Sequence, residues 1–261
     1  VWFVHLGLAA GAVVDGGMMA PPDFDAEVGK WPLLMHVYGE PAGTTVNDRW
    51  GSASQLWHRL LAQEGYVVAS IDNRGTPAPK GRAWRKSVYG EIGVLASADQ
   101  AEAVLGLIEA NPWIDAERVG IWGWSGGGSM TLNALFRYPE IYSAGIAVAF
   151  VADQRYYDTI YQERFMNTPQ ANPEGYRAGS PIHHASGLED PVLLVYGTGD
   201  DNCHYQNFEA LVNELVKQGK QFDQLAYPNR RHGIHEGAGT SLHLRRSMLR
   251  WWKQNLPPGP V

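Results

Sequence analysis

Short apolar runs alternate with longer amphipathic segments along most of the chain. Six apolar runs predict strands, at residues 32–38, 66–72, 119–124, 144–150, 191–197 and 222–228. Most of these runs are apolar nearly throughout, which is typical of strands buried on both faces of a mainly parallel sheet. Five segments with apolar residues at helical spacing predict helices, at residues 52–65, 95–110, 130–140, 205–220 and 240–256. This alternation predicts an α/β fold with right-handed crossovers and helices on both faces of the sheet.

The first 25 residues follow a different pattern. Residues 1–6 and 12–24 predict a hairpin that leads into the domain, with Gly16 and Gly17 as signals for a turn or a bulge. The apolar N-terminal run lacks the basic region of a signal peptide, and Asp15 interrupts it before it could span a bilayer. We therefore expect one domain over residues 1–261, with no membrane segment in this chain.

Composition narrows the possible partners. Apolar residues make up 44% of the 261 residues and charged residues 18%, which is typical of a globular protein. The net charge is −6, and no run of Lys or Arg indicates binding to nucleic acid or to an anionic membrane. Cys203 is the single cysteine, so an intrachain disulfide and a zinc site with several cysteines are excluded. One cysteine leaves both the cytoplasm and the periplasm open.

The segment Gly123-Trp124-Ser125-Gly126-Gly127 matches the pattern G-x-S-x-G. It follows a predicted strand and precedes a predicted helix, which is the context of a nucleophile elbow. We expect the glycines to make room for a tight turn that lifts the Ser125 hydroxyl above the sheet. The alternative is a glycine-rich turn in which the serine is passive.

A serine nucleophile needs a base, and the base needs an acid that orients it. In proteins with this elbow the acid and then the histidine follow the serine along the chain. Asp200 and Asp201 follow the predicted strand at residues 191–197. His232 and His235 follow the strand at 222–228, and the order favours His232 with His235 as the nearest alternative. We assign the other histidines to packing or surface roles: His5, His36, His58, His183, His184, His204 and His243.

Several motifs occur together in an order that resembles a known family. The segments "GWSGGG", "GTGDDNCHYQ" and "YPNRRHGI" resemble the catalytic domain of the prolyl oligopeptidase family, and most closely its dipeptidyl-peptidase-IV-like branch. Residues 36–43, 72–76 and 151–166 resemble further landmarks of that branch. The resemblance implies an α/β-hydrolase fold and a serine peptidase that cleaves after proline or alanine without a metal or cofactor. It also implies Asp200 as the acid and His232 as the base, with Asp201 bonded to loop backbone.

An oxyanion hole is expected beside the serine. The N–H group of Gly126 is the first donor, because it belongs to the residue after the nucleophile. The resemblance implies the Tyr38 hydroxyl, in "HVYGEP", as the second donor. The alternative for Tyr38 is a tyrosine that caps a buried strand.

The resemblance also implies a small apolar pocket for the residue before the cleaved bond. Tyr157 and Tyr161 would wall it, and they are four residues apart, so they would share a face if the segment is helical. Other expected members are Val151, Asn202 and Trp124. Gly126 stands where relatives often carry tyrosine, so we expect a more open pocket. Cys203 is expected to line this pocket or to pack beneath it.

The family's β-propeller is absent from residues 1–261. The chain is therefore expected to be one domain of a longer protein or a domain that works alone. A domain working alone would favour small activated esters and short amides, so a carboxylesterase is the alternative to the peptidase. A non-catalytic interaction protein of the same fold is a second alternative. Peptides or small esters are thus the expected substrates, and the resemblance favours a bacterial periplasm while leaving the compartment undecided.

The last predicted helix carries many apolar residues. We expect some of them to remain on the surface after the core is packed and to form a homodimer contact. The residues concerned are Leu242, Leu244, Met248, Trp251 and Trp252.

Overall fold

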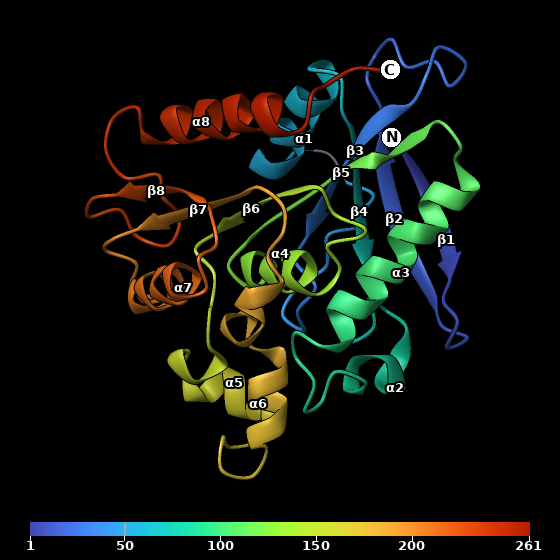
Figure 1. Ribbon diagram of the computed structural model, residues 1–261. Coiled ribbons are helices and arrows are strands. Elements are labelled where there is room, and N and C mark those ends of the chain that lie inside the picture. The colour runs from blue at the N-terminus through green and yellow to red at the C-terminus, as the bar shows by residue number, and fades with distance from the viewer. Residues whose placement is uncertain (50) are drawn as a thin grey trace.

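A single eight-stranded sheet runs through the computed structural model, which describes residues 1–49 and 51–261 (Figure 1). The strands follow the order β1-β2-β4-β3-β5-β6-β7-β8 across the sheet. From β4 to β8 all neighbours are parallel, whereas β1 and β2 are antiparallel. The strands are β1 (Trp2–Gly7), β2 (Val13–Met19), β3 (Trp31–Val37), β4 (Val67–Asp72), β5 (Ile114–Trp124), β6 (Ala144–Val148), β7 (Val192–Gly197) and β8 (Asp223–Tyr227).

Helices cover both faces of this sheet. On one face lie α1 (Ala53–Gln63) and α8 (Thr240–Asn255), and on the other lie α3 (Leu95–Ala110), α4 (Gly126–Arg137) and α7 (Gln206–Lys217). Each group packs its apolar side chains into a separate core cluster against the strands. The mainly parallel sheet, its six core strands and the five helices are therefore confirmed. The start predicted for α4 is wrong, because the helix begins at Gly126, directly after the serine, rather than at residue 130.

Short helices form a second layer that the sequence pattern did not predict. Between β6 and β7 the chain forms the 3₁₀ helices η1 (Gln154–Tyr156) and η2 (Pro181–Gly187) around α5 (Thr159–Met166) and α6 (Pro173–Gly179). Another short helix, α2 (Gly81–Lys86), follows β4. Each has too few turns for a clear apolar period. α5 and α6 extend away from the sheet, at the end of the molecule opposite α8 (Figure 1).

The N-terminal hairpin is confirmed, but its predicted turn is wrong. Gly16 and Gly17 lie inside β2, where they pair with Val4 and Phe3. The turn lies at residues 8–12 instead. A Cβ atom on Gly16 would come within 2.7 Å of Val4 Cγ2, so this glycine allows close packing between the strands.

The expected apolar surface on α8 is also wrong. Leu244, Met248, Trp251 and Trp252 are buried in the chain's own core, and only Leu242 is exposed, at 56%. These side chains pack inside the chain's own core, so the apolar face on which the homodimer was based is missing. A homodimer through α8 stays an untested prediction.

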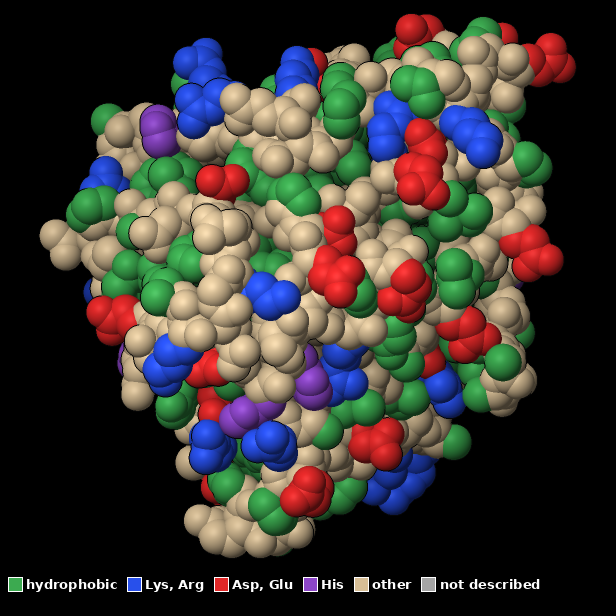
Figure 2. Space-filling model, in the orientation of Figure 1, with side chains coloured by type: hydrophobic (Ala, Val, Ile, Leu, Met, Phe, Trp, Pro, Cys, Tyr) green, Lys and Arg blue, Asp and Glu red, His purple; other side chains and the backbone are tan. Residues whose placement is uncertain are grey.

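The surface shows no separation of charge on the face drawn in Figure 2. Lys, Arg, Asp and Glu side chains are interspersed there, in keeping with the modest net charge of −6. In the part of the chain that the structure describes, no helix is long and apolar enough to cross a membrane.

Candidate active site

Ser125 sits in a strained turn between β5 and α4. Its backbone has φ +60° and ψ −124°, a conformation that few residues other than glycine adopt. The Ser125 N–H group donates to the Val148 carbonyl oxygen at 2.9 Å, which ties the turn to β6. The serine therefore sits at the carboxyl edge of the parallel strands, directly before the N-terminus of α4, as expected of a nucleophile elbow.

Two glycines of the turn are required by the approach of backbone to backbone. A Cβ atom on Gly123 would lie 2.6 Å from the Val37 carbonyl oxygen and would also collide with Gly127. A Cβ atom on Gly127 would collide with the same carbonyl. No flexible side chain can move aside to relieve these contacts, so both positions exclude any larger residue.

Replacing Gly123 with alanine is expected to destabilise the fold by more than about 4 kcal/mol, the range reached only by severe steric or packing defects. Urea unfolding followed by circular dichroism measures the effect. Gly106→Ala in α3 is the matched control, because its Cβ would meet only Leu6 Cδ2, at 4.0 Å. Since alanine favours helix, that variant should be neutral or more stable by up to about 1 kcal/mol. A loss below about 1 kcal/mol for Gly123→Ala would contradict the steric account.

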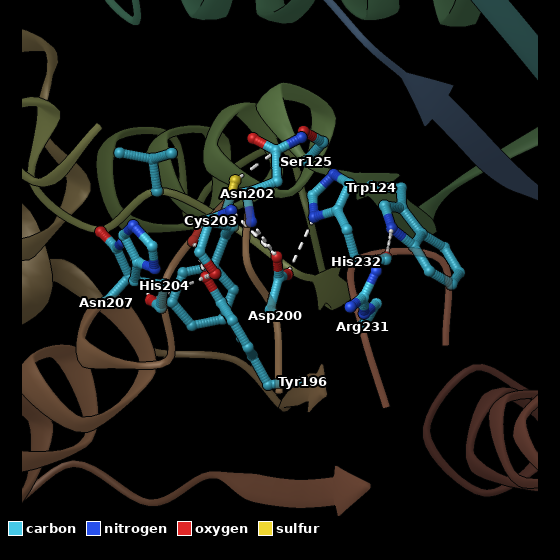
Figure 3. Close-up of polar contacts among 12 residues, drawn as sticks. Trp124, Ser125, Tyr196, Asp200, Asn202, Cys203, His204, Asn207, Arg231 and His232 are labelled. Atoms are coloured by element: carbon cyan, nitrogen blue, oxygen red, sulfur yellow. Dashed lines mark hydrogen bonds and ion pairs between the residues drawn. The ribbon is translucent and has the colours of Figure 1, made fainter. Parts of the chain in front are cut away.

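Asp200 and His232 lie together on loops that follow β7 and β8. His232 Nδ1 is 2.8 Å from Asp200 Oδ2, and Asp200 is only 5% exposed (Figure 3). The other carboxylate oxygen, Oδ1, accepts the backbone N–H groups of Asn202 at 2.9 Å and Cys203 at 3.0 Å. Trp124 Nε1 donates to the His232 carbonyl oxygen at 2.9 Å, which fixes the histidine loop against the elbow. Both the acid and the ring are thus held in place by neighbours.

A direct bond between Ser125 Oγ and a ring nitrogen of His232 is not among the hydrogen bonds of the described residues. Ser125 Oγ instead contacts Cys203 Sγ at 4.0 Å. In the view of Figure 3, Ser125 lies above the level of the His232 ring and Asp200 below it. A catalytic serine would donate to the second ring nitrogen, so the two groups would have to come closer than they are in this structure. Apo active sites often show such loose geometry.

The alternative residues lie elsewhere. His235 is exposed, and its nearest acidic partner is Glu236, with His235 Nε2 and Glu236 Oε1 4.0 Å apart. Asp201 was expected to bond loop backbone, and this is wrong, because its carboxylate lies 3.5 Å from Arg231 Nη1 at the surface. Of the four residues left open by chain order, only Asp200 and His232 meet.

Tyr38 and Gly126, the two predicted oxyanion donors, lie beside the serine. Tyr38 directly follows β3, and it lines cavities on both sides of Ser125. Burial and, second, the nearby Glu40 carboxyl raise the pKa of Tyr38 to about 12. The phenol therefore keeps its proton at neutral pH and can donate it in a hydrogen bond.

A cavity of about 240 Å³ lies on one side of Ser125. Tyr157 and Tyr161 wall it with their rings edge to face, 5.5 Å apart. They do not share a helix face, since Tyr157 precedes α5 and Asp158 caps that helix. Val151 and Asn202 line the same cavity, and Asn202 Oδ1 accepts the Tyr157 hydroxyl at 2.9 Å.

Glu40 is a lining residue that the sequence analysis missed. The residue is 9% exposed, and its side chain fills the space beside Gly126, where a Cβ atom would lie 2.5 Å from Glu40 Cδ. The expectation of a more open pocket at Gly126 is therefore wrong, because a carboxyl occupies the space that the missing side chain leaves. The one available signal was an acidic residue two positions after Tyr38, at the end of an apolar strand.

Trp124 lies on the other side of the serine. It lines a larger cavity, of about 540 Å³, that it shares with Tyr38 and Ser125. It does not line the tyrosine-walled cavity, so its expected place in that pocket is wrong. Cys203 is buried beneath the serine and packs in the core cluster. Ser125 thus separates two cavities of different size.

Comparison with known proteins places this chain in one family. A family model described as "Prolyl oligopeptidase family" matches residues 53–258. A protein of Uncinocarpus reesii named "Probable dipeptidyl-aminopeptidase B" is 40% identical over 232 residues, which cover 87% of this chain and 25% of that protein. The "Dipeptidyl peptidase 4" of Trichophyton equinum is 34% identical, over 100% of this chain and 34% of its own length.

A solved structure agrees with these sequence matches. The crystal structure of Porphyromonas gingivalis dipeptidyl peptidase 4 superposes with a TM-score of 0.92 at 40% identity, covering 98% of this chain and 35% of that one. The chain thus spans about a quarter to a third of the length of the relatives it matches. Their likeness extends over the α/β-hydrolase fold, with its mainly parallel sheet and flanking helices. The chain belongs to the prolyl oligopeptidase family.

Proposed function

We propose that this chain is the catalytic domain of a serine hydrolase that cleaves peptide bonds after proline or alanine, as a dipeptidyl peptidase does. The observation that carries the proposal is the bond between His232 Nδ1 and the buried Asp200 carboxylate, at 2.8 Å, beside the strained turn at Ser125. The names of the relatives support peptide substrates for this site.

In the proposed reaction Ser125 Oγ attacks the carbonyl carbon of the substrate and gives its proton to His232 Nε2. Asp200 keeps the imidazole in the required tautomer and stabilises its charge. The Gly126 N–H and the Tyr38 hydroxyl donate hydrogen bonds to the negatively charged oxygen that forms from the carbonyl. His232 then passes the proton to the leaving amine, which departs and leaves an acyl-enzyme.

Water completes the cycle by attacking the acyl carbon while His232 takes one of its protons. The proton returns to Ser125 Oγ as the acid product leaves. In this proposal the 240 Å³ cavity holds the residue before the cleaved bond, and the 540 Å³ cavity is available to the leaving group.

A pair of reporters tests the proposal. Release of the dye from a Gly-Pro amide is compared with hydrolysis of a short-chain p-nitrophenyl ester by the same protein. Turnover of the amide supports the peptidase, whereas turnover of the ester alone would favour the carboxylesterase. If neither reporter is hydrolysed and a fluorophosphonate fails to label Ser125, the non-catalytic interaction protein is the better explanation.

Replacing Tyr38 with phenylalanine is expected to lower kcat about 10²–10³-fold, the usual cost of one oxyanion donor. The change removes only the hydroxyl, so KM should change much less than kcat. Steady-state kinetics on the cleaved reporter measures both. Tyr89→Phe is the control, because Tyr89 is 58% exposed and away from both cavities. A Tyr38→Phe enzyme within threefold of wild type would remove Tyr38 from the oxyanion hole.

A further inference from the structure

Glu40 places an acidic group inside the cavity beside the nucleophile. It follows Tyr38 by two residues, and Gly39 between them has φ +78°, a turn that brings the carboxyl back against Gly126. A Cβ atom on Gly126 would lie 2.9 Å from Glu40 Oε1, so this oxygen lies close to the backbone expected to bind the oxyanion. The carboxyl is thus within the space that a substrate acyl group would enter.

Only one of the two carboxyl oxygens has a partner in the described part of the chain. The Tyr161 hydroxyl donates to Oε2 at 2.7 Å. Tyr161 is in turn held between the rings of Tyr157 and Phe165, at centroid distances of 5.5 and 5.1 Å. No described donor contacts Oε1. One oxygen is therefore fixed to the pocket wall, and the other can accept a hydrogen bond from a ligand.

The charge state of the carboxyl bears on which partner it can bind. The described residues that line the cavity include no Lys, Arg or His. Burial raises the pKa of the Glu40 carboxyl, and the Tyr161 hydrogen bond opposes this only in part. A hydroxyl suits either protonation state, because it can donate to a carboxylate and accept from a carboxylic acid. An ammonium can only donate, so it requires the ionised form.

The volume of the cavity limits the size of the side chain that it can bind. The cavity has a volume of about 240 Å³, and Val151 and the two tyrosines are among the residues that line it. We propose that Glu40 is a specificity-determining residue: among the small side chains that fit before the cleaved bond, it favours one that bears a hydroxyl, such as serine, over an apolar one of similar size. The hydroxyl would bond to Glu40 Oε1. This inference rests on the proposed function, because it takes the cavity as the acyl pocket of a peptidase.

Two reporters that differ in one group test this selection. Serine and 2-aminobutyrate have side chains of similar size, but the first ends in a hydroxyl and the second in a methyl. We measure kcat/KM for Gly-Ser and Gly-aminobutyrate amides and take their ratio. Wild type should prefer serine, whereas Glu40→Leu should lower the ratio about tenfold, as expected for one lost hydrogen bond to a buried acceptor. Glu40→Gln keeps a polar group at this place and should lower the ratio less than threefold.

The readouts separate this inference from the proposed function. Turnover of both amides with a preference for aminobutyrate in wild type would overturn the role of Glu40 and leave the peptidase standing, even if no variant folds. The same conclusion follows if Glu40→Leu keeps the wild-type ratio while a fluorophosphonate still labels Ser125. Labelling of Ser125 without turnover of any amide, Gly-Pro included, would overturn the peptidase itself. A third reporter carries 2,3-diaminopropionate, whose side chain ends in an ammonium, before the cleaved bond. If wild type prefers it to serine, the proposal that Glu40 binds an uncharged hydroxyl is wrong.

Discussion

Replacing Ser125 with alanine is expected to lower kcat about a millionfold on every substrate that the protein hydrolyses. The estimate follows from subtilisin, a serine hydrolase of another fold, in which removing the nucleophile alone costs about as much as removing all three triad residues. The alanine leaves the turn and the loop of His232 and Asp200 in place, because neither depends on the serine hydroxyl. Activity should disappear while the fold is retained.

Fluorophosphonate labelling followed by peptide mass mapping measures the loss directly, together with kcat on the cleaved reporter. Ser241→Ala is the control, because Ser241 is exposed in the first turn of α8. It should be labelled and turn over substrate like wild type. Residual labelling of Ser125→Ala at another serine, with activity preserved, would show that the nucleophile lies elsewhere.

Replacing Asp200 with asparagine is expected to lower kcat about ten-thousandfold. Asparagine fits the same space, and its carbonyl oxygen can still accept the backbone N–H groups of Asn202 and Cys203. Its amide nitrogen, however, would then face His232 Nδ1 as a donor. The imidazole would be forced to carry its proton on Nε2, where it could not accept the proton of Ser125.

The neighbouring aspartate offers a matched control for this variant. Asp201→Asn removes the same charge one residue later, from a surface pair with Arg231. Since such pairs contribute little, kcat should stay within twofold of wild type. The rate of fluorophosphonate labelling should fall with kcat in Asp200→Asn and remain unchanged in Asp201→Asn. Equal losses in both variants would contradict the assignment of Asp200 as the acid.

Patterns within short segments predicted much of the sheet and of the candidate site. Continuous apolar runs identified β3 to β7, since a strand buried on both faces has no polar side to show. Glycines around Ser125 identified the turn, because only they fit where backbone meets backbone. The order of serine, acid and histidine along the chain in this fold then limited the acid and the base to the loops after β7 and β8. These features depend on neighbours in the sequence or on a fixed order of elements.

The spacing of residues along the chain could not decide between two candidate residues that are close in sequence. Asp200 and Asp201 are adjacent, yet one is buried against His232 and the other is exposed. The sequence pattern was equally silent about α5 and α6, whose few turns give no clear period, although they place Tyr161 at the cavity. The direction in which a loop side chain points depends on the backbone conformation of that loop. Loops have no regular repeat, so this direction cannot be predicted from the sequence pattern.

By itself, then, the sequence determined the parallel sheet, the strained serine turn and the order of the acid and base, because periodicity and glycine placement are local properties. Only the tertiary structure decided that Trp124 lies on the far side of Ser125 from the tyrosines and that Glu40 fills the space beside Gly126. Glu40 and Tyr161 are 121 residues apart and come from different layers of the fold. Contacts of this kind form only when separate elements pack, so no pattern along the chain contains them.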